Sequence, residues 1–160
     1  MTHPKDISGV WHGTYFFDLA EQRPADGGGV AFELRLTQSW LQRIFGTFRG
    51  SVTDDPTRGM SGTGTVRGKH SQTSLRFTKR MPVAEFTYNG KAVSLQQLFE
   101  RHGLAYRAPR NAHPPILYVG AFTSDSVAAG TWVIEEGTIR ISARRHVPLP
   151  RCTGTFTLTR

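Results

Sequence analysis

Cysteine is nearly absent from this 160-residue chain, which contains Cys152 alone. A single thiol excludes an internal disulfide, so we expect a protein of the reducing cytoplasm. No apolar run approaches the ~20 residues that a membrane-spanning helix needs, and residues 1–6 lack the apolar stretch of a signal peptide. We therefore expect no membrane partner and a single domain over residues 1–160, a length that supports a core without disulfides or metals.

Acidic residues are scarce as well, since 12 Asp and Glu stand against 20 Lys and Arg and leave a net charge of +8. Phosphate contacts dominate nucleic-acid binding, so this charge raises the question of a polyanionic partner. Most basic residues, however, are spread along the chain and alternate with apolar ones, as on the solvent face of a strand. We favour a solvated basic surface and keep nucleic acid or an acidic protein as the alternative. The basic residues that do cluster are Arg140, Arg144, Arg145, His146 and Arg151.

Signatures of metal or cofactor chemistry are also missing. The six histidines are widely separated, without the short spacing of paired metal ligands, so we expect neither a metal nor a cofactor. Cys152 and His146 lack the flanking pattern of a nucleophile pair, which favours a partly buried thiol. Neighbouring residues of a strand point to opposite faces, so the pairs Asp54–Asp55 and Glu135–Glu136 are expected as exposed turn residues rather than acid–base pairs.

What the chain does contain is a regular alternation of apolar and polar residues, with a period of two. In residues 30–37, Phe32, Leu34 and Leu36 fall on one face and polar residues on the other, which predicts a half-buried strand. Repetition of this pattern between turn signals predicts an all-β protein, a single up-and-down antiparallel β-barrel of about eight strands with a short helical insertion. The expected strands are 10–17, 30–37, 43–52, 60–67, 70–80, 116–123, 128–135 and 152–159, with a tight turn at Gly68–Lys69 and a short strand or edge extension at 138–143.

Residues 81–115 interrupt this rhythm. Ser94 is suited to cap a helix because Leu95, Leu98 and Phe99 follow it at helical spacing. Gly103 is the expected end of that helix. Since long insertions in compact domains are usually functional or mobile, we expect a turn and a short helix over one end of the barrel.

The segment Ser8-Gly9-Val10-Trp11 opens the first expected strand with Gly-x-Trp, which resembles the opening of lipocalins and avidin-like proteins. Gly46-Thr47-Phe48, residues 130–134 and residues 154–157 also resemble avidin-like strands. The resemblance implies the calycin architecture, an eight-stranded barrel with Trp11 across one end. It further implies a late arginine stacked on that indole, a part that Arg160 would play, and a tendency of the barrel to assemble into oligomers. The biotin-contact pattern does not match, so no biotin specificity is implied.

We expect this barrel to bind a small molecule at its open mouth, away from Trp11 and beneath the insertion, because small barrels hold one ligand among aromatic walls. Arg76, Lys79 and Arg107 are expected at the rim, where they would favour an anionic or polar ligand. The inward aromatic residues are either ligand contacts or plain core; as ligand-binding candidates we name Tyr15, Phe48, Phe77, Tyr118 and Trp132.

Catalysis is the second hypothesis. Some calycin-like barrels are cyclases or isomerases that shape a substrate with few catalytic groups, and Tyr15, Tyr118 and His12 are the first residues to test for such a role. The sequence does not decide between binding and catalysis and assigns no catalytic residue. The third hypothesis is an interaction module that uses the basic cluster around Arg144 and Arg145.

Overall fold

Eight antiparallel strands close into a barrel in the computed structural model, which describes residues 4–19, 23, 26–83, 85–88, 91–105, 113–140, 143–144 and 146–160. Each barrel strand pairs with the next barrel strand along the chain, and the last closes on the first. This confirms the predicted all-β, up-and-down architecture, which is consistent with a calycin-like fold. The barrel strands are β1 (Gly9–Phe17), β2 (Val30–Thr37), β3 (Thr47–Asp54), β4 (Thr63–His70), β5 (Ser74–Arg80), β8 (Ile116–Ser124), β9 (Val127–Ile134) and β12 (Cys152–Thr159).

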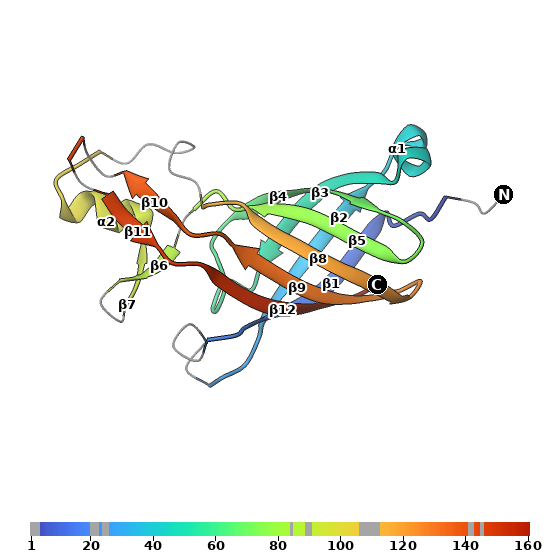
Figure 1. The fold of residues 1–160 in the computed structure, drawn as a ribbon, viewed down its shortest axis with the longest axis horizontal. Coiled ribbons are helices and arrows are strands. Elements are labelled where there is room, and N and C mark those ends of the chain that lie inside the picture. Colours follow the sequence, from blue (N-terminus) through green and yellow to red (C-terminus); the bar gives the residue numbers. More distant parts are fainter. Residues whose placement is uncertain are drawn as a thin grey trace.

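Two insertions lie at the same end of the barrel (Figure 1). Between β5 and β8 the chain forms the hairpin β6 (Glu85–Tyr88) and β7 (Lys91–Ser94), followed by helix α2 (Leu95–Arg101). Between β9 and β12 it forms a second hairpin, β10 (Gly137–Arg140) with β11 (His146–Leu149). We call this the insertion end. No helix in the described ranges is long and apolar enough to cross a bilayer.

The predicted helix in the first insertion is confirmed. Ser94 caps α2 through a capping box with Gln97, in which each side chain bonds the other residue's backbone N–H. Gly103 follows the helix with φ of +67°, a left-handed conformation that suits glycine. The first part of the expected short strand or edge extension at 138–143 is β10, which pairs with β11 in a sheet of its own rather than with the barrel; residues 141–142 lie outside the described residues.

The expected strand over 43–52 is wrong at its beginning, because Trp40–Phe45 form helix α1. Ser39 caps this helix through a capping box with Gln42, and Gly46 ends it with φ of +61°. Four large apolar residues in six made the segment look like a strand. The Ser39-x-x-Gln42 spacing is the local signal that outweighs them.

The expected turn at Gly68–Lys69 is also wrong, because both residues lie inside β4. Gly68 suits that place because a Cβ here would come within 2.3 Å of the Arg76 carbonyl oxygen and within 2.6 Å of both the Phe48 ring and the Phe77 Cβ. The turn instead falls at 71–73, where the Ser71 hydroxyl accepts hydrogen bonds from the backbone N–H groups of Thr73 and Ser74.

Trp11 seals the end opposite the insertions, here called the closed end. Its ring is 1% exposed, and its indole N–H donates to the carbonyl of Ile7 at 2.9 Å. The Arg160 guanidinium lies 5.3 Å from the centre of the Trp11 ring and donates to the carbonyls of Asp6 and Ser8. The predicted stacking of Arg160 on Trp11 is therefore confirmed.

Candidate functional site

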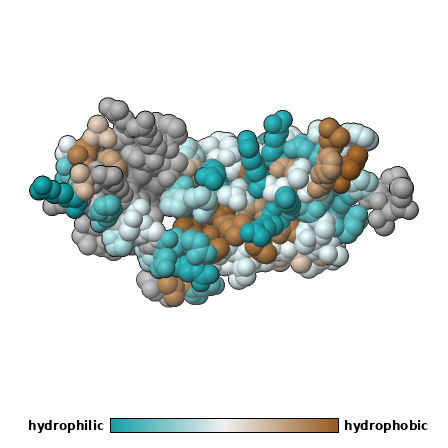
Figure 2. Space-filling view, turned by 45° about the horizontal axis from the view of Figure 1, so that its top comes forward, coloured by the Kyte–Doolittle hydropathy of each residue, from teal (hydrophilic) through white to brown (hydrophobic). Residues whose placement is uncertain are grey.

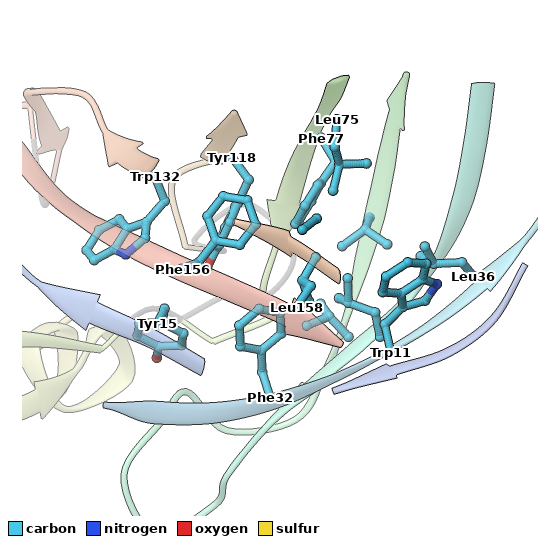
Figure 3. Packing of buried hydrophobic residues seen from close by; sticks show 14 of the residues in the cluster. Trp11, Tyr15, Phe32, Leu36, Leu75, Phe77, Tyr118, Trp132, Phe156 and Leu158 are labelled. Carbon is cyan, nitrogen blue, oxygen red and sulfur yellow. The ribbon is translucent and has the colours of Figure 1, made fainter. Parts of the chain in front are cut away.

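The five aromatic residues named as ligand contacts all point into the barrel and are at most 5% exposed. Phe77 and Tyr118 stack face to face with ring centres 4.6 Å apart, and Phe48 packs edge-on against Phe77. Tyr15 and Trp132 meet edge-on at 5.9 Å. Figure 3 shows Tyr15 and Trp132 at one end of the core and Trp11 at the other, with Phe77 and Tyr118 between them. In this structure these rings pack against one another and fill the interior.

A hollow of about 10 Å³ lies at the closed end. This volume is close to the minimum for one water molecule, and the walls are apolar, so it does not make a ligand site. The hollow is lined by Ile7, Trp11, Leu34, Leu36, Phe48, Leu75, Phe77, Phe122 and Leu158.

The chemically distinctive feature of the interior is an ion pair between Lys79 and Asp54. The Lys79 ammonium donates to Asp54 Oδ1, and both side chains are 0% exposed. Asp54 ends β3 and Lys79 lies near the end of β5, two strands away in the barrel. The Asp54 carboxylate also accepts at Oδ2 from the Tyr15 hydroxyl at 3.1 Å and from the backbone N–H of Met60 at 3.2 Å. The pair is thus charge-matched and held by hydrogen bonds.

Two sequence predictions are corrected here. Asp54 is not an exposed turn residue: it shares the inward parity of Phe48 and Val52 on β3, whereas its neighbour Asp55, beyond the end of the strand, is half-buried. Lys79 is not at the rim: Leu75, Phe77 and Lys79 alternate on the inner face of β5. The sequence predicts both inward positions when the alternation of inward and outward residues is continued from Val52 to Asp54 on β3 and from Phe77 to Lys79 on β5. The expected exposure of Glu135 and Glu136 is confirmed.

Aromatic rings complete the surroundings of the ammonium. Lys79 Nζ lies 4.9 Å from the centre of the Tyr15 ring and 5.5 Å from that of Phe32. Burial lowers the pKa of Lys79, while the Asp54 carboxylate acts in the opposite direction. Burial raises the pKa of Tyr118 well above its ordinary value, and the nearby Asp54 charge adds to this. The site therefore combines a cation, an anion and phenol groups in an environment without solvent.

Met81 and His113 lie where the chain leaves and re-enters the barrel at the insertion end. Both are buried, and the His113 backbone N–H donates to the Met81 carbonyl at 3.3 Å. The His113 ring places Nδ1 at 2.7 Å from the Pro114 carbonyl, which makes Nδ1 the protonated nitrogen. Burial lowers the pKa of His113, the Pro114 hydrogen bond raises it, and the charges of Lys79 and Asp54 act on it in opposite directions. The ion pair and this imidazole therefore form one electrostatic unit.

The loop between β3 and β4 packs tightly against the same unit. A Cβ added to Gly59 would overlap the Asp54 side chain and come within 2.9 Å of Val30 Cγ1. The backbone N–H of Gly59 donates to the Asp55 carbonyl at 2.7 Å, which places the loop so that Met60 can reach Asp54. Substitution of this glycine would therefore disturb the carboxylate directly.

The other candidates do not join this unit. His12 is exposed on the outer face of β1, so it does not converge with Tyr15 and Tyr118. The Cys152 thiol is half-buried, as predicted, and burial raises its pKa to about 11. Arg76 is exposed, and Arg107 lies outside the described residues.

A metal centre and the basic cluster are two other kinds of site that the sequence raises. Among the residues that the structure describes, no three His, Cys, Asp or Glu side chains gather as metal ligands. In the basic cluster, Arg144, His146 and Arg151 are exposed, whereas the side chains of Arg140 and Arg145 lie outside the description. No protein-family model, curated protein or solved structure matches this chain.

Proposed function

We propose that this protein is a binding barrel that takes a small molecule at the insertion end, with Lys79 and Asp54 as its polar recognition groups. The supporting observation is the complete burial of this ion pair in an otherwise aromatic interior. Apolar residues of similar volume in place of a buried ion pair are often neutral or stabilising, by about 1–4 kcal/mol. Stability alone is therefore a weak reason for the pair, and recognition of a ligand is a stronger one.

The chemistry of the pair suggests the class of ligand. An ammonium group has three N–H donors, and within the described part of the chain Lys79 donates to Asp54 alone. A carboxylate, sulfonate or conjugated carbonyl group could accept from the other two. The aromatic residues at this end, Tyr15 and Trp132, would pack against an apolar body. The proposed ligand is thus a compact apolar molecule with one strong acceptor group.

Entry of such a ligand requires a movement of the residues that cover the insertion end of the barrel, here called the cover. Met81 and His113 lie outside the barrel strands and are joined by a backbone hydrogen bond of 3.3 Å, which is one of several interactions of His113. Both lie near the ends of the insertion, whose displacement would open the barrel above Lys79. We therefore propose that the ligand takes the place of this cover rather than of the aromatic core.

Titration with 1-anilinonaphthalene-8-sulfonate, an apolar fluorophore with one anionic group, tests the proposal. We expect saturable binding of one molecule per chain and a loss of affinity of roughly tenfold or more in the double variant Asp54→Asn/Lys79→Met, since a hydrogen bond to a charged group contributes ~1.5–3 kcal/mol. The matched control is Glu135→Gln/Arg151→Met, which neutralises an exposed ion pair at the same end. All proteins carry Leu41→Ser and Phe45→Ser to remove apolar α1 side chains. Binding that the Asp54/Lys79 double variant leaves intact would contradict the proposal.

Catalysis is the second candidate, on the observation that Lys79 contacts Asp54 beside the Tyr15–Asp54 hydrogen bond and that the charges of Lys79 and Asp54 act on His113; burial lowers the pKa of both Lys79 and His113. Perturbed acid–base groups gathered in one place are typical of active sites. The reaction class would be proton transfer in a cyclisation or isomerisation. Deuterium exchange at the α-carbon of simple cyclic ketones, lost in His113→Gln, would favour it over binding alone.

The proposal extends to the family of the protein and to its cellular compartment. Membership of the lipocalin-like or avidin-like barrels is supported by the Gly9-Val10-Trp11 opening and by the Arg160–Trp11 stacking. The lone Cys152 supports a location in the cytoplasm.

A further inference from the structure

Helix α1 leaves all four of its large apolar side chains exposed. None of its side chains is buried, and Trp40 and Phe45 are 70% and 74% exposed. Leu41 and Ile44, at 57% and 48%, complete a patch of four large apolar side chains within six residues. Soluble proteins scatter such residues singly, and a contiguous patch marks a contact surface.

The barrel holds this helix firmly although it does not cover it. The capping box of Ser39 closes one end of α1, and at the other end the Gly46 carbonyl accepts from the His70 backbone N–H at 2.7 Å. Arg43 on the helix pairs with Asp6 at 3.2 Å. The apolar side chains therefore project from a helix that is tied to the rest of the protein by these bonds. The patch belongs to the folded structure and is not part of a frayed loop.

The barrel wall beside α1 carries charge of one sign. On β3, β4 and β5 every charged residue of the outer face is basic, and four of them lie in the half of these strands next to α1: Arg49, Arg67, Lys69 and Arg76. Figure 2 shows hydrophilic side chains projecting from the wall beside the apolar side chains of α1.

These basic residues stand opposite one another. Arg49 pairs in register with Arg67, and Lys69 pairs in register with Arg76. Like charges directly opposite on neighbouring strands destabilise a sheet. Among the described residues, none of these four forms an ion pair with a carboxylate. An anionic partner would relieve the repulsion, and the surface is complementary to one.

We propose that α1 and the four basic residues form a docking surface for an anionic phospholipid bilayer. Tryptophan and phenylalanine on a short element flanked by Lys and Arg are typical of side chains that enter the headgroup region, while the cations meet the lipid phosphates. The aliphatic Leu41 and Ile44 favour a lipid over a nucleic acid, whose bases stack on aromatic rings. This surface lies at the closed end, away from the proposed ligand site (Figure 1). It docks on the membrane and does not span it.

Co-sedimentation of the full chain with vesicles tests this proposal. We expect binding to vesicles of phosphatidylcholine with phosphatidylglycerol but not to pure phosphatidylcholine, together with a blue shift of tryptophan emission. Because each basic residue near an anionic surface contributes ~1 kcal/mol, Arg67→Glu/Lys69→Glu should lower the partition coefficient roughly tenfold or more. Leu41→Ser/Phe45→Ser should lower it as well, and Trp40→Phe should abolish the blue shift while leaving binding in place.

The matched control is Arg101→Glu/Arg144→Glu, which changes the net charge by the same amount with exposed residues far from α1. An equal loss of vesicle binding in this control would show that net charge alone, and not this surface, governs the binding, and it would overturn the proposal. It would also be overturned by a self-association, measured by analytical ultracentrifugation, that Leu41→Ser/Phe45→Ser abolishes, or by binding to polyuridylate with none to vesicles. Circular dichroism checks that each variant is folded; since the substituted residues are exposed, we expect no change.

Discussion

The two ends of the barrel are sealed in different ways. At the closed end an indole fills the opening, and its polar atom and its cationic neighbour Arg160 both bond to backbone carbonyls. At the insertion end two opposite charges, Lys79 and Asp54, are removed from solvent completely. Packing suffices to close a small barrel, as the closed end shows. The desolvated charges at the other end therefore point to a requirement other than closure, and they lie where the insertions gather.

The largest expected effect comes from breaking the pair on one side. Lys79→Met leaves the Asp54 charge buried without its counter-ion, so we expect a loss of about 3–5 kcal/mol in the free energy of unfolding. The double variant Asp54→Asn/Lys79→Met removes both charges and should recover most of this loss. Urea denaturation followed by circular dichroism measures both values. Equal destabilisation by the single and double variants would mean that the two groups do not act as a pair.

A smaller effect concerns pH. Burial lowers the pKa of His113, so the unfolded chain binds a proton more readily than the folded one as pH falls through about 6.5. Stability should therefore fall from about pH 7 to about pH 5, by ~1.4 kcal/mol for each unit of pKa depression. His113→Gln should flatten this dependence. His70, near the closed end, also has a pKa lowered by burial, and His70→Gln is the comparison that separates the contributions of the two ends.

Weaker still is the contribution of Arg160. An exposed cation over an indole stabilises by about 0.5–1 kcal/mol, so Arg160→Ala should lower the free energy of unfolding by that amount. Arg160→Lys should keep part of it. Tryptophan fluorescence during urea unfolding reports the change, and an unchanged midpoint for Arg160→Ala would show that the stacking does not stabilise the closed end.

The smallest effect is expected on α1. Trp40→Ser replaces a side chain that is 70% exposed, and surface substitutions of this kind usually stay within about 0.5 kcal/mol. The thermal midpoint should hardly move. A large drop would mean that Trp40 serves the fold, and it would weaken the case for a docking surface.

Much of the barrel was predictable because alternation fixes a strand wherever it is strict. The expected bounds 30–37 and 152–159 are those of β2 and β12, and Ser94 marked the beginning of α2. The prediction failed where another pattern competed with the alternation. In α1 the apolar content of the helix hid the capping box at Ser39.

The candidate site was harder to predict. The Asp-Asp-Pro sequence suggested a turn, whereas alternation along β3 places Asp54 inside, and the same alternation places Lys79 inside β5. Even when both side chains are known to point inward, the sequence does not predict the contact between Asp54 and Lys79. Strand β4 separates β3 from β5, and only the curvature of the closed barrel brings the two side chains together. The influence of the pair's charges on His113, which lies near the end of the insertion, depends on the same closure.

The central claim, that the insertion end is the binding end, is tested most directly by the indole N–H signals in a ¹⁵N–¹H correlation spectrum. The chain has three tryptophans: Trp11 at the closed end, Trp132 toward the insertion end and Trp40 on α1. Each signal is assigned by substitution with phenylalanine. During titration with 1-anilinonaphthalene-8-sulfonate we expect a saturable shift of the Trp132 signal, absent in Asp54→Asn/Lys79→Met, while the Trp11 signal stays in place. A shift of Trp11 or Trp40 with Trp132 unmoved would contradict the claim.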